Sequence, residues 1–280
     1  ISIVCDSKMF KGQESLISKL LPETVVVYKN ISKLNRKIAP YSFSIRASEC
    51  LDLPGLTFEK RTAPLEGEQK RLYREMEKDC LAWLEESKSG EGEKLTAQII
   101  LSKYLRLQQI TGGFFPTDEG KVHPIPKGAK EKILEDVFEE IAGDPCVIVC
   151  RFRPEMDTVG LVANRLGRKV VEIHGDVSSA NRDEAKRAYQ AGEADTFVMQ
   201  IQVGRFGLTL TRGRHIIYYS CSWSLEDREQ SIKRIHRKGQ EQKCVVWDLV
   251  CEHTIDELVA EACARKLNVS DLALGWRPGR

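Results

Sequence analysis

The sequence predicts an α/β fold in which helices cover both faces of a parallel β-sheet, preceded by a mostly helical region. Over residues 146–267, short runs rich in apolar and β-branched residues alternate with stretches of helical length, as is typical of parallel strands joined by helical crossovers. Residues 1–145 lack this alternation and hold long amphipathic stretches with irregular connections. We therefore divide the chain into residues 1–127, a helical region ending in a linker, and residues 128–280, the region that carries the sheet.

Strands and helices alternate regularly in the second region. The predicted strands are Cys146–Phe152, Lys169–His174, Thr196–Ile201, His215–Tyr219 and Cys244–Val250. The predicted helices span residues 154–166, 179–191, 225–237 and 254–267. Pro154 suits a first helical turn, Ser178 or Ser179 can cap the next helix, and Gly192 can end it. Since ligands of such sheets bind beyond the carboxyl ends of the strands, the loops after those ends are the first place to look for a site.

The first region is predicted to be built mainly from helices. Its expected helices are Leu16–Leu21, Ile31–Ile38, Glu66–Glu86 and Thr96–Ile110, and Ala129–Ile141 then leads into the sheet. Leu72, Met76, Leu81 and Leu84 are the core candidates of the third helix. Leu56–Pro64 is a possible strand. Thr111–Lys127 contains three Gly and three Pro and is predicted to be a linker or long loop.

Composition excludes several classes of protein. With 280 residues, 41% hydrophobic and 30% charged, the chain is expected to fold around a core and to be neither fibrous nor disordered. Its longest apolar run, near Cys146–Cys150, is far below the ~18 residues of a membrane span, and no secretory signal is visible, so we expect no membrane partner. The 43 basic and 41 acidic residues neither demand nor exclude a nucleic-acid partner.

The cysteines and histidines predict neither disulfides nor a metal site. The nine cysteines are scattered without a CxxC pair, which favours a reducing, intracellular compartment. The five histidines are dispersed, so we expect no metal to be bound by this chain. Because the chain begins at Ile1, we expect it to be an excised or processed piece of a longer protein.

The densest cluster of functional residue types lies at the end of the predicted helix 225–237. At helical spacing, Gln230, Arg234 and Arg237 would share one face. Two guanidinium groups side by side can clamp a phosphate, because arginine stays charged and offers a planar fork of donors. The alternative is a solvated basic helix whose arginines pair with Glu226 and Glu229.

The spacing QxxxRxHRxGQ over residues 230–240 resembles motif VI of the Swi/Snf-type branch of the superfamily two helicase-like ATPases. Val147–Phe152 resembles motif IV, and Gln202–Thr211 resembles motif V (GGxGLNLT), with Arg205 in place of the second glycine and Thr209 in place of Asn. Residues 216–230 resemble the segment around Trp-Asn-Pro, although Ser224 and Leu225 depart from it and Ser220 stands where many members have Asp. Further matches are Leu53-Pro54, Gln69–Tyr73, Leu105–Ile110 and Thr254–Glu257, so the resemblance covers roughly residues 34–267.

This resemblance implies a motor with two RecA-like lobes and ATP, with Mg²⁺, in the cleft between them. The chain resembles the second, C-terminal lobe, preceded by the tail of the inter-lobe region, so the N-terminal lobe of the same protein is an expected partner. The first lobe's phosphate loop, GxxxxGK[ST], is absent here, since Gly120-Lys121 is followed by Val122. Asp183–Lys186 only superficially resembles the Mg²⁺-binding motif, because it lies within a polar helix. We therefore expect the chain alone to hydrolyse no ATP.

The resemblance also implies roles for individual residues. Arg234 and Arg237 would reach the γ-phosphate across the cleft, with Gln230 as a polar bridge and Gly204 and Gly207 allowing a tight loop. The expected contacts to the DNA backbone are Arg151, Arg153, Arg205, Thr209 and Thr211, although the two threonines could simply cap their loop. We expect the Arg234 face to be exposed to solvent at the carboxyl edge of the strands.

The function that this resemblance implies is the C-terminal motor lobe of a DNA-dependent ATPase that translocates on double-stranded DNA. One alternative is a non-catalytic nucleic-acid- or partner-binding module, and another is a nucleotide-driven switch that acts on protein. The variant residues and short inter-lobe region favour a microbial, phage or viral member and hence a cytoplasmic location, with the nucleus left open.

Overall fold

The computed structural model describes residues 3–4, 25–26, 36–37, 39–41, 52–87, 93–117, 120–205 and 207–263, with the backbone alone described over much of 80–101 and at 204–205. The expected helix Leu16–Leu21, most of Ile31–Ile38 and the side chains of Leu81 and Leu84 therefore lie outside the described residues. Near the N-terminus, β1 (Ile3–Val4) pairs antiparallel with β2 (Val25–Val26), and η2 (Ala39–Tyr41) is a short 3₁₀ helix.

Six parallel strands form the central sheet, and the predicted fold class is confirmed. In spatial order they are β3 (Leu56–Ala63), β10 (Cys244–Cys251), β9 (His215–Tyr218), β6 (Cys146–Cys150), β8 (Thr196–Gln200) and β7 (Val170–Ile173). All five pairings are parallel. The edge strand β3 comes from the region before residue 128 and pairs with β10 along its whole length, from Leu56 opposite Cys244 to Ala63 opposite Cys251.

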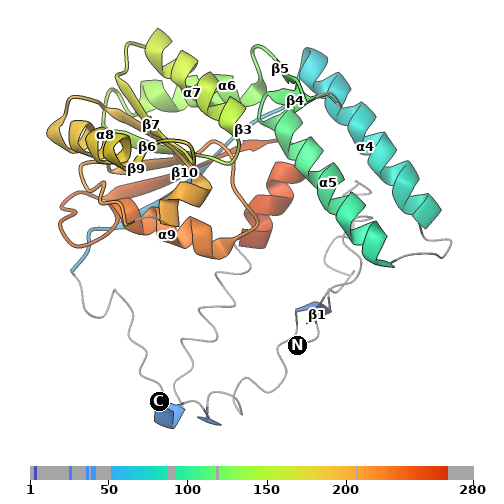
Figure 1. Ribbon diagram of the computed structural model, residues 1–280, viewed down its shortest axis with the longest axis horizontal. Coiled ribbons are helices and arrows are strands. Elements are labelled where there is room, and N and C mark those ends of the chain that lie inside the picture. Colours follow the sequence, from blue (N-terminus) through green and yellow to red (C-terminus); the bar gives the residue numbers. More distant parts are fainter. Residues whose placement is uncertain are drawn as a thin grey trace.

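Helices cover both faces of this sheet (Figure 1). On one face lie α6 (Ala129–Glu140) and α7 (Arg153–Arg165), and on the other α8 (Ser179–Ala191) and α9 (Leu225–Ile235). Strand β6 is buried on both sides, because alternate residues point to opposite faces: Ile148 packs with α6 and α7, whereas Val147 and Val149 pack on the α8 and α9 side. A continuous apolar strand is therefore the expected signature of this position.

The helix ends follow from local sequence. The Ser178 hydroxyl caps α8 by accepting a hydrogen bond from Asn181 N at 3.2 Å, and Gly192 ends it in a left-handed conformation with φ 83°. Ser224 caps α9 in the same way through Asp227 N. Residues 255–263 form a further helix, which begins one residue later than predicted.

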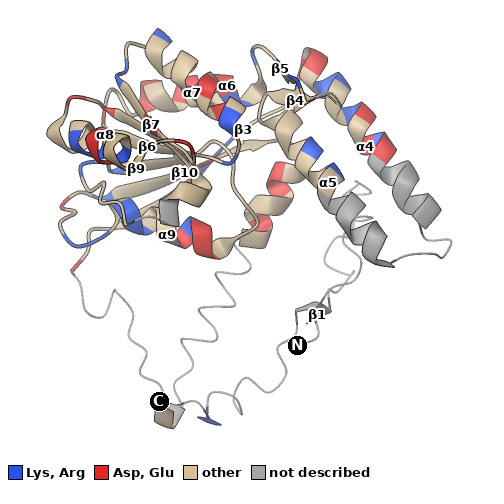
Figure 2. Cartoon of the chain, viewed as in Figure 1, with Lys and Arg blue, Asp and Glu red and all other residues tan. Residues whose placement is uncertain are grey.

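The long helices α4 (Gly67–Ser87) and α5 (Glu93–Thr111) form a pair to one side of the sheet (Figure 1). The predicted core residues Leu72 and Met76 pack against a cluster that includes Leu107 of α5. Acidic and basic side chains both occur along the described part of α4 (Figure 2).

The predicted loop Thr111–Lys127 is wrong in part, because it contains a β-hairpin. Strands β4 (Phe114–Pro116) and β5 (Val122–Pro124) pair antiparallel. Two of the prolines that favoured a loop occupy the last positions of these three-residue strands, where an isolated edge pair tolerates them. Gly120, at φ 78°, supplies the left-handed conformation that the turn requires.

Candidate functional site

The direction of α9 decides where the predicted arginines lie. The helix starts after the carboxyl end of β9 and runs back along the sheet. Just past its end, His236 Nε2 lies 2.8 Å from the carbonyl of Pro54, which precedes β3, and Gln240 Nε2 donates to the carbonyl of Gly213, which precedes β9, at 2.9 Å. The basic end of α9 is therefore near the amino edge of the strands, and the expected position at the carboxyl edge is wrong. A crossover helix returns antiparallel to its strands, so its last residues reach the opposite edge.

Arg234 and Arg237 lie close together beside the segment that leads from η3 (Ile201–Arg205) to β9. Both side chains are half-buried. Arg237 Nη1 donates to Thr209 Oγ1 at 3.1 Å and lies 3.5 Å from the carbonyl of Leu208, while the carbonyl of Arg234 accepts from Leu210 N at 2.9 Å. Burial, and after it the positive charge of Arg237, lowers the pKa of Arg234. Two guanidinium groups that repel one another in this way would be stabilised by an anion between them.

The shared helical face predicted for this cluster is wrong at Arg237. The helix α9 ends at Ile235, so Arg237 lies on the loop that follows, ahead of Gly239 at φ 96°. Gln230 Nε2 donates to Glu226 Oε1 at 2.9 Å, one turn earlier on the same helix. Lys233 pairs with Glu229 at 3.4 Å. The alternative reading expected Glu226 and Glu229 to pair with the arginines, whereas these carboxylates contact Gln230 and Lys233.

The segment that resembles motif V packs along α9. Gln240 Nε2 donates to the carbonyl of Thr211 at 3.0 Å, and Gln190 Nε2 of α8 lies 3.5 Å from Thr211 Oγ1. Gly207 has open space beside it, so a Cβ there would meet no neighbouring atom within 4 Å. The side chain of Arg205 and the surroundings of Gly204 lie outside the described residues. Thr209 and Thr211 are thus held near the arginine pair.

Arg151 and Arg153 lie elsewhere, beyond the carboxyl end of β6. The guanidinium of Arg151 donates to Gln108 Oε1 of α5 and lies 5.2 Å from the ring of Phe152; burial lowers its pKa. Arg153 begins α7, and its Nη1 is 3.9 Å from Met156 Sδ, a weak acceptor. The structure therefore divides the predicted contacts to the DNA backbone between two edges of the sheet.

A buried carboxylate that sequence reasoning missed holds the loop after β6. Glu155 is fully buried, and its Oε2 accepts from Arg151 N and Phe152 N, each at 3.0 Å, and from the hydroxyl of Ser220. Burial raises the pKa of Glu155 to about 7, although the nearby charge of Lys130 opposes this shift. Among the described residues, its other oxygen, Oε1, has no hydrogen-bond partner. The detectable signal was the spacing, since Glu155 lies three residues after the N-cap of α7, as in a capping box.

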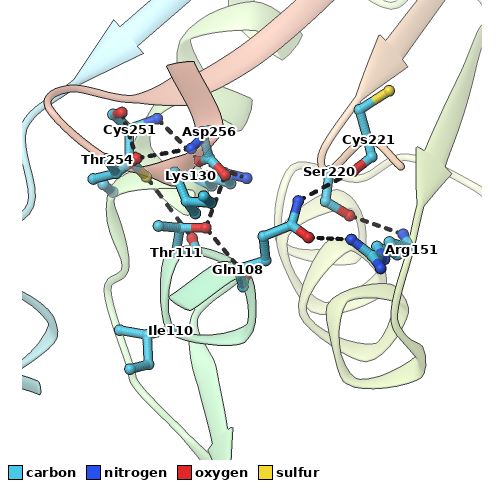
Figure 3. A network of polar contacts seen from close by, with 12 residues as sticks. Gln108, Ile110, Thr111, Lys130, Arg151, Ser220, Cys221, Cys251, Thr254 and Asp256 are labelled. Carbon is cyan, nitrogen blue, oxygen red and sulfur yellow. Dashed lines mark hydrogen bonds and ion pairs between the residues drawn. The ribbon is translucent and has the colours of Figure 1, made fainter. Parts of the chain in front are cut away.

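Buried polar contacts join α5 and α6 to the helix at residues 255–263, which follows the last strand (Figure 3). Lys130 Nζ pairs with Asp256 Oδ2 at 2.9 Å, and Thr111 Oγ1 donates to Asp256 Oδ1 at 2.9 Å. At the other end of this network Gln108 lies between Arg151 and the carbonyl of Cys221, to which its Nε2 donates at 3.3 Å. The segment Thr254–Glu257 marked this region in the sequence, but the lysine partner of its aspartate lies more than a hundred residues away.

A second buried ion pair anchors α9 to β10. Both terminal nitrogens of Arg228 donate to the Asp248 carboxylate, each at 2.7 Å, and the guanidinium lies 4.3 Å from the ring centroid of Tyr218. Burial alone would lower the pKa of Arg228, but the hydrogen bonds to Asp248 outweigh it and raise that pKa. No local sequence pattern marks this pair, because Arg228 resembles the other basic residues of the helix.

Within the described part of the chain, no helix combines the length and hydrophobicity needed to cross a bilayer. Nor do the described residues bring together three or more His, Cys, Asp or Glu side chains in an arrangement that could hold a metal ion.

Comparison with known proteins matches residues 129–239 to the helicase conserved C-terminal domain family. The putative ATP-dependent helicase/translocase YwqA of Bacillus subtilis is 28% identical over 253 residues, which are 87% of this chain and 27% of YwqA. A RAD54-like DNA repair and recombination protein of Drosophila persimilis is 24% identical over 157 residues, 54% of this chain and 20% of that protein. The chain thus spans about a quarter of the length of these relatives.

Two solved structures share the fold. The C-terminal part of the Fun30 ATPase domain superposes with a TM-score of 0.64 at 15% identity, covering 80% of this chain and 96% of that one. The Sulfolobus solfataricus SWI2/SNF2 ATPase core in complex with double-stranded DNA gives a TM-score of 0.63 at 22% identity, covering 87% of this chain and 52% of that one.

Proposed function

Since the chain belongs to the Swi/Snf-type branch of the superfamily two helicase-like ATPases, as their C-terminal RecA-like lobe, we propose that it is one half of an ATP-driven translocase on double-stranded DNA. The observation that carries this proposal is the arginine pair. Arg234 and Arg237 are held together by contacts between α9, its following loop and the segment 208–211. An arginine presented to a phosphoryl group from outside the primary binding site can raise the rate by ~10³–10⁵.

The residues present suit the polyphosphate end of ATP. Burial, and after it the charge of Arg237, lowers the pKa of Arg234, and Arg237 itself donates to neutral oxygens, so an anionic phosphate would be a better acceptor for both. MgATP, bound mainly by the N-terminal lobe of the same protein, would supply the phosphoanhydride bond and its negative charge. Arg234 and Arg237 would then orient and stabilise that charge, with Gln230 one turn away on α9.

DNA would bind at the other edge of the sheet. Arg151 and Arg153, at the carboxyl end of β6, are the proposed contacts to the sugar-phosphate backbone, together with Arg205. Because Thr209 supports Arg237 and Thr211 is held by Gln190 and Gln240, we assign these threonines to the arginine site and no longer to DNA. Contacts to phosphate carry no sequence information, so binding should be non-specific and weaken with salt.

The test is a triplex-displacement assay with the full-length protein that contains this chain. Translocation along the duplex should release the third strand only when ATP is present, and duplex DNA should stimulate ATP turnover. Arg237→Ala should abolish both activities while ATP affinity changes little, because an interaction made mainly in the transition state affects kcat more than ground-state binding. Arg237→Lys should rescue poorly, since a point charge cannot reproduce the planar fork.

Two results would contradict the proposal. Near-normal kcat in Arg237→Ala would mean that the arginine serves only the local packing seen with Thr209. ATP turnover that duplex DNA does not stimulate, with no triplex displacement, would favour a nucleotide-driven switch that acts on protein.

A further inference from the structure

A groove whose polar lining residues are all arginine or glutamine lies next to the proposed DNA contacts. Its walls come from the C-terminal part of α5, the hairpin β4–β5, the start of α7 and the end of β8 with η3. The polar residues of its lining are Arg151, Arg153, Gln109, Gln200 and Gln202. Among the described residues that line it there is no Asp or Glu, although the chain as a whole has nearly as many acidic as basic residues.

The hairpin presents one specific face to this groove. In the antiparallel pairing, Phe114 lies opposite Pro124, Phe115 opposite His123, and Pro116 opposite Val122. Directly opposed residues share a face, so Phe114, Pro116 and Val122 lie together, and these are the hairpin residues that line the groove. The rings of Phe115 and His123 stack on the other face, with centroids 5.3 Å apart. The turn residues 118–119 lie outside the described part of the chain and are not included in this wall.

The groove is positioned and equipped to hold a charged chain. It lies at the carboxyl ends of β6 and β8, the edge at which open parallel sheets bind ligands. Arginine and glutamine side chains offer multiple N–H donors, and Gln202 is exposed. The apolar surface of Val122 and Pro116 opposite the arginines would suit the sugars that alternate with phosphates along a nucleic-acid strand.

We propose that the β4–β5 hairpin is a nucleic-acid-binding element, which holds one strand of DNA by its sugar-phosphate backbone against Arg151 and Arg153. This inference rests on the proposed function and extends it, because it assigns a second wall to the DNA site. The occupant is a polyanionic backbone, since the groove pairs two guanidinium groups and three amides with no carboxylate. The two faces of β5 then differ in role: Val122 contacts DNA, and His123 does not.

The experiment measures the affinity of the 280-residue chain for a fluorescein-labelled 20-base-pair duplex of arbitrary sequence, by fluorescence anisotropy over a range of salt concentrations. Val122→Glu places a negative charge in the groove and should weaken binding about threefold to tenfold. His123→Glu makes the same substitution on the opposite face of the same strand and should weaken binding less than twofold. Val122→Gln, similar in size to the Glu variant but neutral, should retain affinity. Arg153→Gln should reduce the slope of log affinity against log salt by about 0.9, the value of one phosphate contact.

The outcomes separate the two levels of the proposal. If the unaltered chain does not bind the duplex even at low salt, the DNA role of this lobe fails and the groove assignment fails with it. If the chain binds but Val122→Glu matches either Val122→Gln or His123→Glu, DNA binds elsewhere on the lobe, and only the role of the hairpin is overturned. Circular dichroism of each variant checks that the fold is retained, and a variant that loses the fold is replaced by Pro116→Glu on the same face.

Discussion

Glu155 illustrates how a single residue can both order a loop and make stability depend on pH. Its carboxylate satisfies two backbone N–H groups at the start of α7 and the hydroxyl of Ser220, which follows β9. The buried carboxylate of Glu155 therefore fixes the backbone of the loop that carries Arg151 and Arg153. Burying that acid in its charged form is costly, which is why burial raises its pKa from 4.5 to about 7.

The sign of the resulting pH dependence follows from this shift. The folded chain binds the Glu155 proton more tightly than the unfolded chain, so this group's contribution to stability declines as pH rises from about 4.5 to about 7 and is constant above. The decline is on the order of 3 kcal/mol. Glu155→Gln is neutral at every pH and should remove this decline in stability. The unfolding free energy of the variant should therefore rise steadily relative to that of the parent as pH increases over this range.

Urea unfolding of the chain at several values between pH 4.5 and 8 measures this difference. Glu139→Gln, which removes a carboxylate at an exposed position of α6, is the matched control. A profile for Glu155→Gln that does not vary with pH would show that Glu155 titrates in the folded chain as it does in the unfolded one.

At the scale of elements, sequence periodicity predicted the layers of the fold but not their long-range connections. The strands β6 and β10 were placed correctly, because a strand buried on both faces needs apolar residues: β6 is a continuous apolar run, and β10 is interrupted only by Asp248. The hairpin β4–β5 was missed because its strands have three residues each and include prolines. Such short strands carry too few residues to show a period of two.

The sequence predicted which arginines belong to the candidate site but only part of how they are arranged on the fold. Arg234 and Arg237 were found from spacing, but α9 ends before Arg237 and runs to the amino edge of the sheet. Gln108 was not singled out for function, because its partners Arg151 and Cys221 are distant in sequence and no local pattern encodes such pairs. The Lys130–Asp256 pair was missed for the same reason, whereas Glu155 had a local signal in its capping-box spacing.

Gln108 provides the test at this scale, because it joins α5 to the ends of two strands. The side chain is 2% exposed, accepts from Arg151 and donates to the carbonyl of Cys221. Gln108→Ala would leave a half-buried guanidinium and a carbonyl without these partners and should lower the free energy of unfolding by about 1–3 kcal/mol. Gln109→Ala, the next residue on the same helix but half-buried, should cost well under half as much. Denaturant titration measures both, and equal losses would mean that the Gln108 contacts contribute no net stability.

At the scale of the whole molecule, the two proposed sites lie at opposite edges of one sheet. The arginine pair lies toward the amino edge, beside the segments that precede β3 and β9, and the basic groove lies at the carboxyl edge of β6 and β8. The α8 and α9 layer and the central strands separate them. A movement of the lobe as a rigid body, driven from the arginine edge, would therefore displace any strand of DNA held at the groove.

This chain alone should hydrolyse no ATP. Its sequence contains no GxxxxGK[ST] phosphate loop, and its proposed contribution is a pair of arginines that act on phosphates held by another lobe. The two arginines can stabilise a transition state only when a phosphate-binding loop already holds ATP, and this chain has no such loop. Steady-state turnover by the purified chain should therefore equal the buffer background, with or without duplex DNA. The matched control is the chain with Arg237→Ala, purified in parallel, because a contaminating ATPase would give the same trace activity in both preparations. Turnover that exceeds background in the parent chain and is lost in Arg237→Ala would show that the lobe holds a complete ATP site, and the half-site proposal would be wrong.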